Sequence, residues 1–184
     1  GTHGKTTTSS MITWIFENQG CDVGYLIAGK PKNLEHVSRL GSNEIFIIEA
    51  DEYDTAFFDK RAKFVHYLPD ILLINNVEFD HADIYSDLSE IKRQFHHLIR
   101  TMSSCSSLIC PNFDENINDI FKLGLWSRLV QFGNQSSSKN FYKPISPDCS
   151  SIRFSLDKEE KDMEWSMLGE HNAQNAIAAI LAVG

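Results

Sequence analysis

Apolar residues recur along the chain with two different periods, and the alternation of these periods predicts a layered fold. A helical period with one apolar face fits residues 5–19 and 87–101. Short continuous apolar runs, typical of strands buried on both faces of a parallel sheet, occupy residues 45–48 and 71–74. Further strands are predicted at 23–28, 64–67, 107–110 and 128–132, and further helices near 114–123 and from 171 to the end. This order indicates an α/β class, with a mostly parallel sheet flanked by helices.

The texture of the sequence changes after Gly133. Residues 134–151 are rich in Ser, Asn, Lys and Pro, which predicts an irregular surface stretch. Residues 152–156 and 163–168 alternate apolar and polar positions, as a half-exposed antiparallel pair does. We therefore expect a small antiparallel addition near residues 151–168, followed by the last helix.

Composition and charge narrow the class of protein. A chain of 184 residues with 42% hydrophobic and 23% charged residues suits one soluble globular domain. The net charge of -8 argues against a nucleic-acid surface, although a small phosphate ligand needs only a few N–H groups and a local basic side chain. Neither a membrane span nor a signal peptide is expected. The four cysteines form no C-x-x-C pair, which fits a reducing cytoplasm.

The first residues of the chain carry the pattern of a phosphate-binding loop. Gly4-Lys5-Thr6 opens an amphipathic helix and has the form of the back half of a P-loop. Glycine lets backbone N–H groups face phosphate oxygens, the lysine reaches the β- and γ-phosphates, and the threonine hydroxyl can ligate Mg²⁺. The full signature also has an earlier glycine and a leading strand, which this sequence does not contain. A chance Gly-Lys-Thr at a helix start is the alternative interpretation.

A carboxylate follows the apolar run 45–48. Ligands collect at the carboxyl ends of strands in open α/β sheets, so Glu49 is placed to hold Mg²⁺ directly or through water. Glu49 begins a block of four acids in six residues, whose other members are Asp51, Glu52 and Asp54. For each of these other three acids, a solvated acidic loop is an equally good interpretation.

The next apolar run, 71–74, also ends in polar residues. It is followed by Asn75 and Asn76, and then by His81 within an Asp-His-Ala-Asp stretch. Because Mg²⁺ prefers oxygen ligands, chemistry alone favours a hydrogen-bonding or general-base role for this histidine over magnesium ligation. The two runs together predict that polar residues meet at one edge of the sheet.

Four motifs occur in a fixed order: Gly-Thr-His-Gly-Lys-Thr-Thr-Thr (1–8), Glu-Ala-Asp-Glu-Tyr-Asp (49–54), Asn-x-Glu-x-Asp-His (76–81) and Gly-Glu-His-Asn-x-x-Asn (169–175). Together they resemble the central domain of the Mur ligases, the amide-forming enzymes of bacterial peptidoglycan precursors. The resemblance covers essentially the whole chain. It implies that residues 1–184 form the ATP-binding central domain, without the N-terminal UDP-binding and C-terminal amine-binding domains of the family.

Two segments carry a finer resemblance. Residues 51–61 and 63–67 look most like the recycling branch of the family, which joins salvaged L-alanyl-γ-D-glutamyl-meso-diaminopimelate to UDP-N-acetylmuramate. The branch that adds L-alanine usually has Ser at the position of Tyr53 and is the alternative. The implied reaction consumes ATP with Mg²⁺, passes through an acyl phosphate and takes place in the bacterial cytoplasm. A regulatory nucleotide-binding module is the non-enzymatic alternative, and a GTPase is disfavoured because the Asn/Thr-Lys-x-Asp guanine motif is absent.

The resemblance also implies roles for single residues. Lys5 is expected to contact the β/γ-phosphates and to be catalytic together with Glu49 and His81. Thr6, Glu49 and His81 are expected around magnesium. The residues expected to bind the nucleotide through the loop are Gly1, Thr2, His3, Gly4, Lys5, Thr6 and Thr7.

The last motif is expected to reach the base of the nucleotide. Asn172 and Asn175 match the adenine contacts of the family, and an amide can both donate to and accept from the adenine edge. Asparagine is also a good helix cap, which is the alternative interpretation. The carbamylated lysine of some Mur branches has no counterpart in the Gln-Phe-His-His of residues 94–97, so the number of magnesium ions stays open. The substrate contacts expected with less support are Asp51, Glu52 and Asn76.

Overall fold

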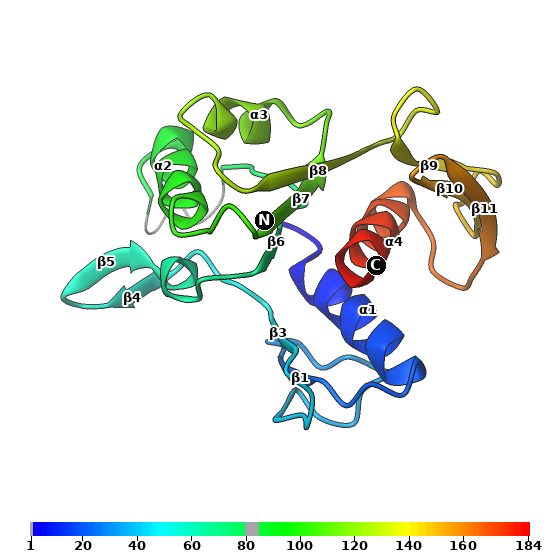
Figure 1. Cartoon of the computed structure of the whole chain (residues 1–184), viewed down its shortest axis with the longest axis horizontal. Coiled ribbons are helices and arrows are strands. Elements are labelled where there is room, and N and C mark those ends of the chain that lie inside the picture. Colours follow the sequence, from blue (N-terminus) through cyan, green and yellow to red (C-terminus); the bar gives the residue numbers. More distant parts are fainter. Residues whose placement is uncertain (1, 80–84) are drawn as a thin grey trace. The chain divides into compact units, whose positions relative to one another are not determined.

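The computed structural model describes residues 2–79 and 85–184 of the chain (Figure 1). The backbone divides into two compact units, each of which is treated by itself below. The first unit comprises Gly1–His3 and Ala50–Gln131, and the second comprises Gly4–Glu49 and Phe132–Gly184. Both are mixtures of helices and strands, so the predicted α/β class is confirmed.

The elements follow the predicted alternation with some additions. Those of the second unit are α1 (Lys5–Asn18), β1 (Gly24–Leu26), β2 (Ser38–Arg39), β3 (Phe46–Ile48), β9 (Asn140–Pro144), β10 (Ser151–Leu156), β11 (Glu159–Glu164) and α4 (Glu170–Val183). Those of the first unit are β4 (Asp54–Ala56), β5 (Asp59–Ala62), the 3-10 helix η1 (Lys63–His66), β6 (Ile71–Leu73), α2 (Leu88–Ile99), β7 (Ser107–Pro111) and α3 (Glu115–Phe121). Strand β8 (Arg128–Gly133) begins in the first unit and ends in the second.

In the first unit, β6 and β7 form a parallel pair with Ile71 opposite Ser107. Helix α2 begins at a true cap, because the Asp87 carboxylate accepts a hydrogen bond from the Glu90 N–H at 3.0 Å. Its apolar face packs into a buried core together with the two strands and α3. The predicted helices at 87–101 and 114–123 and the strands at 71–74 and 107–110 are therefore confirmed, with shifts of a few residues at their ends.

In the second unit, β1 lies between β2 and β3 and runs parallel to β3. Helix α1 packs on one face of these strands through Ile12 and Phe16. The helix ends at Asn18, and Gly20 follows as the predicted stop: its φ of 79° lies in the left-handed region and lets the Cys21 N–H return to the Phe16 carbonyl at 2.9 Å. The opposite face of the strands is only half covered, since Leu26 is 49% and Phe46 is 47% exposed. The prediction that the strand at residues 45–48 is buried on both faces is therefore wrong.

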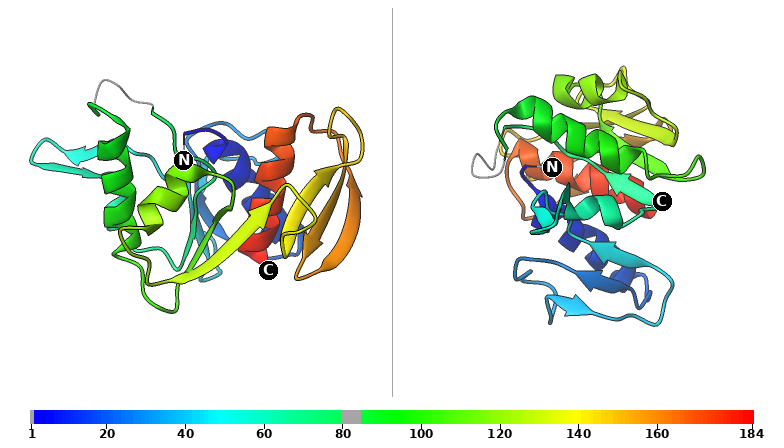
Figure 2. Two further views of the ribbon diagram at one scale, coloured as in Figure 1. Left: turned by 90° about the horizontal axis from the view of Figure 1, so that it is seen from above. Right: turned by 90° about the vertical axis from the view of Figure 1, so that its left-hand side faces the viewer.

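Helices α1 and α4 lie side by side (Figures 1 and 2). The residues of α1 that are fully buried are the small polar ones Thr8, Ser9 and Thr13, and α4 buries mainly alanines. Small side chains let the two backbones approach closely. The Thr13 hydroxyl is satisfied within the helix, since it donates to the Ser9 carbonyl at 2.9 Å, whereas the Thr8 hydroxyl bonds across to Asn175 of α4. The helical period revealed the apolar face of α1, but not this second face.

The predicted antiparallel addition is present with different bounds. Strands β10 and β11 pair with Ile152 opposite Met163, and Asp157 and Lys158 form the connecting turn with positive φ angles of 50° and 76°. This two-residue turn places the second strand at 159–164, because turn geometry sets the register of a hairpin. The strand predicted at 163–168 was therefore placed too late. Strand β11 lies at the edge of its sheet and is charged and largely exposed.

Two further predictions are wrong. The stretch 134–151 contains β9, in which Phe141 and Tyr142 are 3% and 1% exposed, so its polar composition concealed a buried strand. The strand predicted at 64–67 is the 3-10 helix η1, where the adjacent residues Phe64 and Val65 are both buried. A strand would turn these two neighbours to opposite faces, whereas the helical turn lets both reach the core.

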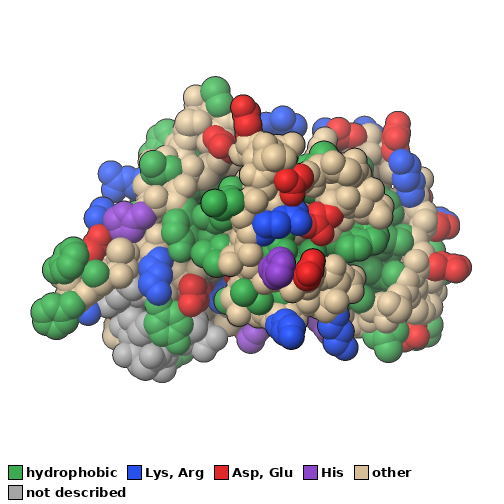
Figure 3. Space-filling model, turned by 90° about the horizontal axis from the view of Figure 1, so that it is seen from below, with side chains coloured by type: hydrophobic (Ala, Val, Ile, Leu, Met, Phe, Trp, Pro, Cys, Tyr) green, Lys and Arg blue, Asp and Glu red, His purple; other side chains and the backbone are tan. Residues whose placement is uncertain are grey.

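The surface carries charges of both signs. Acidic and basic side chains are interspersed on the face drawn in Figure 3, with hydrophobic side chains between them. Phe57 and Phe58, at the turn of the β4–β5 hairpin, are 93% and 92% exposed. Within the part of the chain that the structure describes, no helix is long and apolar enough to cross a membrane.

Candidate functional site

Gly4 opens helix α1 and shapes the start of the second unit. Its φ of 79° and ψ of 1° are left-handed, a conformation that glycine adopts without strain. The Thr8 N–H bonds to the Gly4 carbonyl at 2.9 Å and begins the helix. Because glycine has no side chain to cap the first turn, the N–H groups of Lys5, Thr6 and Thr7 have to find other acceptors, and an anion suits this position.

Asn175 of α4 packs directly against this glycine. A Cβ built on Gly4 would lie 2.5 Å from the Asn175 Oδ1, so any other residue at position 4 would require Asn175 to shift. The Thr8 hydroxyl donates to the same Oδ1 at 3.2 Å, and Asn175 is only 5% exposed. The amide thus holds the first turn of α1 and the left-handed residue before it. An adenine contact of Asn175 stays a prediction.

The carboxylate of Glu49 connects the end of β3 to two other elements. Its Oε1 accepts a hydrogen bond from the Thr6 hydroxyl at 2.8 Å, and its Oε2 accepts one from the Ala28 N–H at 2.9 Å. Gly29 lies against the same threonine, since a Cβ on this glycine would meet the Thr6 methyl group at 2.5 Å. The carboxyl end of β1 therefore packs against the start of α1. This meeting of strand end and helix start is the one expected from the apolar run before Glu49.

The chemistry of this pair fits a magnesium ion. A hydroxyl and a carboxylate are the hard oxygen ligands that Mg²⁺ prefers, and here they are already in hydrogen-bond contact. Thr6 and Glu49 are two of the three residues predicted around the metal. The third, His81, lies outside the described residues, as does Gly1 of the loop.

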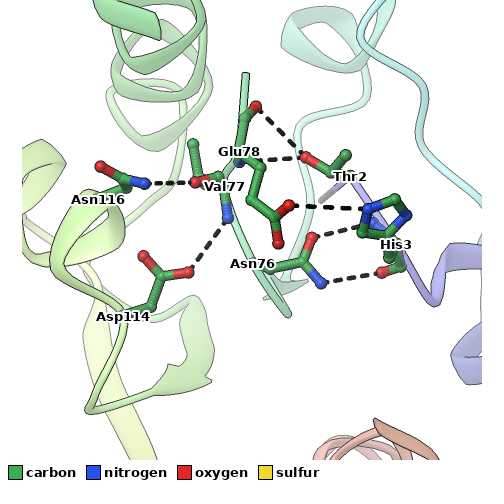
Figure 4. A network of polar contacts seen from close by, with 7 residues as sticks. All are labelled: Thr2, His3, Asn76, Val77, Glu78, Asp114 and Asn116. Carbon is green, nitrogen blue, oxygen red and sulfur yellow. Dashed lines mark hydrogen bonds and ion pairs between the residues drawn. The ribbon is translucent and has the colours of Figure 1, made fainter. Parts of the chain in front are cut away.

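In the first unit, Thr2 and His3 are held by the segment that follows β6 (Figure 4). Asn76 bonds to both backbone groups of His3: its Oδ1 accepts from the His3 N–H at 3.0 Å, and its Nδ2 donates to the His3 carbonyl at 3.2 Å. The Glu78 N–H donates to the Thr2 hydroxyl at 3.1 Å, and the Glu78 carboxylate lies 3.7 Å from the His3 ring. The side chain of Asn76 is thus engaged with the loop. A substrate contact of Asn76 stays a prediction.

The acids after Glu49 differ in their surroundings. Glu52 is 4% exposed and belongs to the buried polar residues, and its carbonyl accepts a hydrogen bond from the Tyr85 hydroxyl. Asp51 accepts a hydrogen bond from the Glu52 N–H at 3.0 Å. Glu52 is therefore not a residue of a solvated acidic loop. Contacts of both acids with a substrate stay predictions.

Asn172 lies at the first turn of α4, where its Nδ2 donates to the Leu168 carbonyl at 2.7 Å. The neighbouring Glu170 carboxylate accepts a hydrogen bond from Tyr142 at 3.2 Å. Burial and this carboxylate raise the pKa of Tyr142, so its hydroxyl stays a donor at neutral pH. Helix α4 begins after Gly169 without a side-chain cap, and Asn172 donates to a carbonyl instead of accepting from a backbone N–H, so the alternative capping role is not observed. The adenine contact of Asn172 stays a prediction.

Several residues of this arrangement escaped the sequence analysis. Thr8, Ala28 and Gly29 lie next to predicted residues, and the Ala-Gly after β1 carried a usable signal because it also follows an apolar strand. Asp114 and Asn116, which hold Val77 in Figure 4, carried no such signal. Their sequence predicts only the start of a helix.

Comparisons with known proteins identify the family of the chain. The model of the Mur ligase middle domain matches residues 1–183. The chain therefore belongs to the Mur ligase middle-domain family. This Mur ligase domain is 47% identical over 183 residues to the UDP-N-acetylmuramate–L-alanyl-γ-D-glutamyl-meso-2,6-diaminoheptandioate ligase of Escherichia coli. The aligned region covers 99% of this chain and 40% of that protein.

Other relatives rank the branches of the family. The UDP-N-acetylmuramate–L-alanine ligase of Syntrophomonas wolfei is 31% identical to this Mur ligase domain, over 98% of this chain and 38% of that protein. The crystal structure of the L-alanyl-γ-D-glutamyl-meso-diaminopimelate ligase from Neisseria meningitides superposes with a TM-score of 0.88 at 41% identity, and covers 99% of this chain and 58% of that one. The chain thus spans about two fifths of the length of the curated relatives that it matches.

Proposed function

We propose that this Mur ligase domain binds ATP for a ligase that joins L-alanyl-γ-D-glutamyl-meso-diaminopimelate to UDP-N-acetylmuramate in peptidoglycan recycling. The observation that carries the proposal is the bond between Thr6 and Glu49 behind the left-handed Gly4. A hydroxyl at a helix start and a carboxylate at a strand end form the magnesium side of a P-loop site. The branch is supported by the 47% identity to the tripeptide ligase, against 31% for the L-alanine ligase.

The reaction balances in two steps. A carboxylate oxygen of UDP-N-acetylmuramate bonds to the γ-phosphorus of ATP, and the bond from that phosphorus to the ADP oxygen breaks. The amine of the tripeptide then bonds to the carbonyl carbon of the acyl phosphate, inorganic phosphate leaves, and the amine loses a proton. Phosphorylation is needed because a free carboxylate has no good leaving group.

The chain contributes alignment and charge to the first step. Backbone N–H groups at the start of α1 bind phosphate oxygens, and Lys5 offsets the negative charge of the β- and γ-phosphates. The ion would be held by Thr6 and Glu49 together with His81, and Mg²⁺ would there neutralise charge on the transferring phosphoryl group. We propose that Asn172 and Asn175 lie near the adenine. We also propose that Asp51, Glu52 and Asn76 serve the substrate side.

The amine donor is tested with the full-length enzyme, offered the tripeptide or L-alanine together with ATP, Mg²⁺ and UDP-N-acetylmuramate. We expect phosphate release and an amide product with the tripeptide, and much slower turnover with L-alanine. Faster turnover with L-alanine would assign the protein to the other branch. ATP binding without phosphate release in the presence of all substrates would instead support a regulatory nucleotide-binding module.

The role of Glu49 is tested by Glu49→Gln, which keeps the shape of the side chain and one acceptor oxygen but removes the charge. We expect kcat to fall about ten- to a hundredfold and the magnesium concentration needed for half-maximal activity to rise, since the ion loses an anionic partner. Glu44→Gln, at an exposed position before β3, is the matched control and is expected to leave both quantities unchanged. An unchanged magnesium dependence of Glu49→Gln would contradict the metal role.

The relatives are bacterial ligases whose names both contain UDP-N-acetylmuramate, which supports the proposed location in the bacterial cytoplasm. This location stays a prediction for this protein. The relatives are about two and a half times as long as this chain, in keeping with flanking domains that bind the UDP group and the incoming amine. We propose that these domains supply most of the contacts to both substrates.

A further inference from the structure

The start of helix α3 holds the backbone of a residue from a different segment. Asp114 precedes the helix, and its Oδ2 accepts a hydrogen bond from the Val77 N–H at 3.2 Å. Asn116 lies in the first turn, and its Nδ2 donates to the Val77 carbonyl at 2.7 Å. Both backbone polar groups of Val77 are thus bound by α3 (Figure 4).

The helix itself does not require this pair of side chains. Asp114 caps α3 through its other oxygen, Oδ1, which accepts from the Ile117 N–H at 3.0 Å. Serine or asparagine would cap the helix about as well, but only a carboxylate has a second acceptor free for Val77. Asparagine is an unfavourable residue inside a helix, so the contact with Val77 gives Asn116 a reason to be there.

Val77 lies between the two residues that hold the loop. Its side chain is 1% exposed and packs in the hydrophobic core of the first unit, which fixes the position of residues 76–78. On either side, Asn76 bonds to both backbone groups of His3, and the Glu78 backbone bonds to the Thr2 hydroxyl. A continuous set of hydrogen bonds therefore leads from α3 through residues 76–78 to residues 2–3.

We propose that Asp114 and Asn116 are positioning residues for nucleotide binding, acting through Val77 on Thr2 and His3. The inference rests on the proposed function, since it takes Thr2 and His3 to belong to the ATP-binding loop. Neither residue falls within the four motifs of the sequence. A loop that binds phosphate through its backbone binds more tightly when it is already ordered, because less conformational entropy is then lost on binding.

The experiment compares two asparagines of the same helix in the full-length enzyme. Asn116→Ala removes the donor to Val77. Asn118→Ala is the matched control, since Asn118 is also half-buried on α3 and donates to the Asn112 carbonyl at 3.2 Å. We expect Asn116→Ala to raise the KM for ATP about five- to tenfold, the loss of one hydrogen bond, with kcat and the KM for UDP-N-acetylmuramate within about twofold. Asn118→Ala is expected to leave all three within about twofold of the wild type.

A second variant separates the loss of the bond to Val77 from a loss of helix stability. Asp114→Ser keeps a capping oxygen for Ile117 but gives up the acceptor for Val77. We expect faster hydrogen exchange at the Val77 amide, retained protection at Ile117, and a KM for ATP raised as in Asn116→Ala. An equal rise in KM for Asn116→Ala and Asn118→Ala would overturn the proposal. Faster exchange at Val77 with an unchanged KM would also overturn it.

ATP binding measured by calorimetry distinguishes this proposal from the ligase function. A wild-type enzyme that binds ATP but joins no substrates would refute the ligase function. If Asn116→Ala but not Asn118→Ala then bound ATP more weakly, the positioning role of Asn116 would still be supported. If the enzyme is an active ligase and Asn116→Ala binds ATP as tightly as the wild type, the positioning role is refuted and the ligase function is retained.

Discussion

Replacing Lys5 with alanine is expected to lower the kcat/KM of ATP-dependent ligation by at least about a hundredfold in the full-length enzyme. The lysine is the first residue of α1 and is half-buried. We expect its ammonium group to reach the β- and γ-phosphates bound at the start of the helix. Alanine removes the only charge of this turn that can offset the γ-phosphate during transfer. Phosphate release in the presence of both substrates measures the effect.

The fold should survive this change. Alanine has the highest helix propensity, and the side chain of the first helical residue is not needed for the backbone bonds of α1. Lys161→Ala, on the exposed strand β11, is the matched control and is expected to change neither the activity nor the thermal unfolding midpoint. If Lys5→Ala kept more than a few per cent of wild-type turnover with an unchanged unfolding midpoint, the phosphate role of Lys5 would be wrong.

The second large effect is expected at Gly4. An alanine there meets two obstacles: the backbone has a φ of 79°, and the new Cβ would lie 2.5 Å from the Asn175 Oδ1. Because Asn175 is buried and bonded to Thr8, it cannot move away without loss. We expect Gly4→Ala to destabilise the domain by about 2–4 kcal/mol and to weaken ATP binding strongly, since the loop that presents the N–H groups is displaced.

Gly20 offers a control with the same backbone conformation. Its φ is also 79°, but a Cβ would meet nothing within 4 Å. Gly20→Ala should therefore show the backbone strain alone, about 1 kcal/mol, and ATP affinity like that of the wild type. The thermal unfolding midpoint is expected to decrease from wild type to Gly20→Ala to Gly4→Ala. Equal midpoints for the two variants would mean that Asn175 does not restrict position 4.

A double variant tests the collision directly. Removing the obstacle with Asn175→Ala costs the bond to Thr8, but it frees the space that a Cβ on Gly4 needs. We expect the double variant Gly4→Ala/Asn175→Ala to be less destabilised than the sum of the two single variants, because neighbouring residues that compete for one volume are not additive. Simple additivity would show that the strain of the backbone accounts for the whole effect at position 4.

Much of the fold could be predicted because burial leaves a periodic trace in the sequence. The apolar runs before Glu49 and Asn75 became β3 and β6, and the helical period ending at Gly20 became α1. The failures lie where the period is short or mixed. Phe64 and Val65 form an apolar pair that fits a strand or a helical turn equally well. Only the burial of both side chains in one core decides between the two structures, with the Phe64 and Phe95 ring centroids 5.1 Å apart.

The candidate site divides in the same way. The meeting of Thr6 with Glu49 followed from a general rule about strand ends, so it was accessible from the sequence. The contact between Asn175 and Gly4 joins residues 171 positions apart through helix packing, which no local pattern contains. Asp114 and Asn116 carry only a capping signal, and their second partner, Val77, becomes visible only in three dimensions.

The charged edge strand β11 has a consequence for the protein in concentrated solution. Its six residues, Glu-Glu-Lys-Asp-Met-Glu, include four acids, and Asp162 is paired with Arg153 of the neighbouring strand at 2.7 Å. The unused backbone groups of an edge invite strand pairing between molecules, and like charges on both partners oppose it. Repulsion between copies therefore opposes pairing of strand β11 with the same strand of a second molecule.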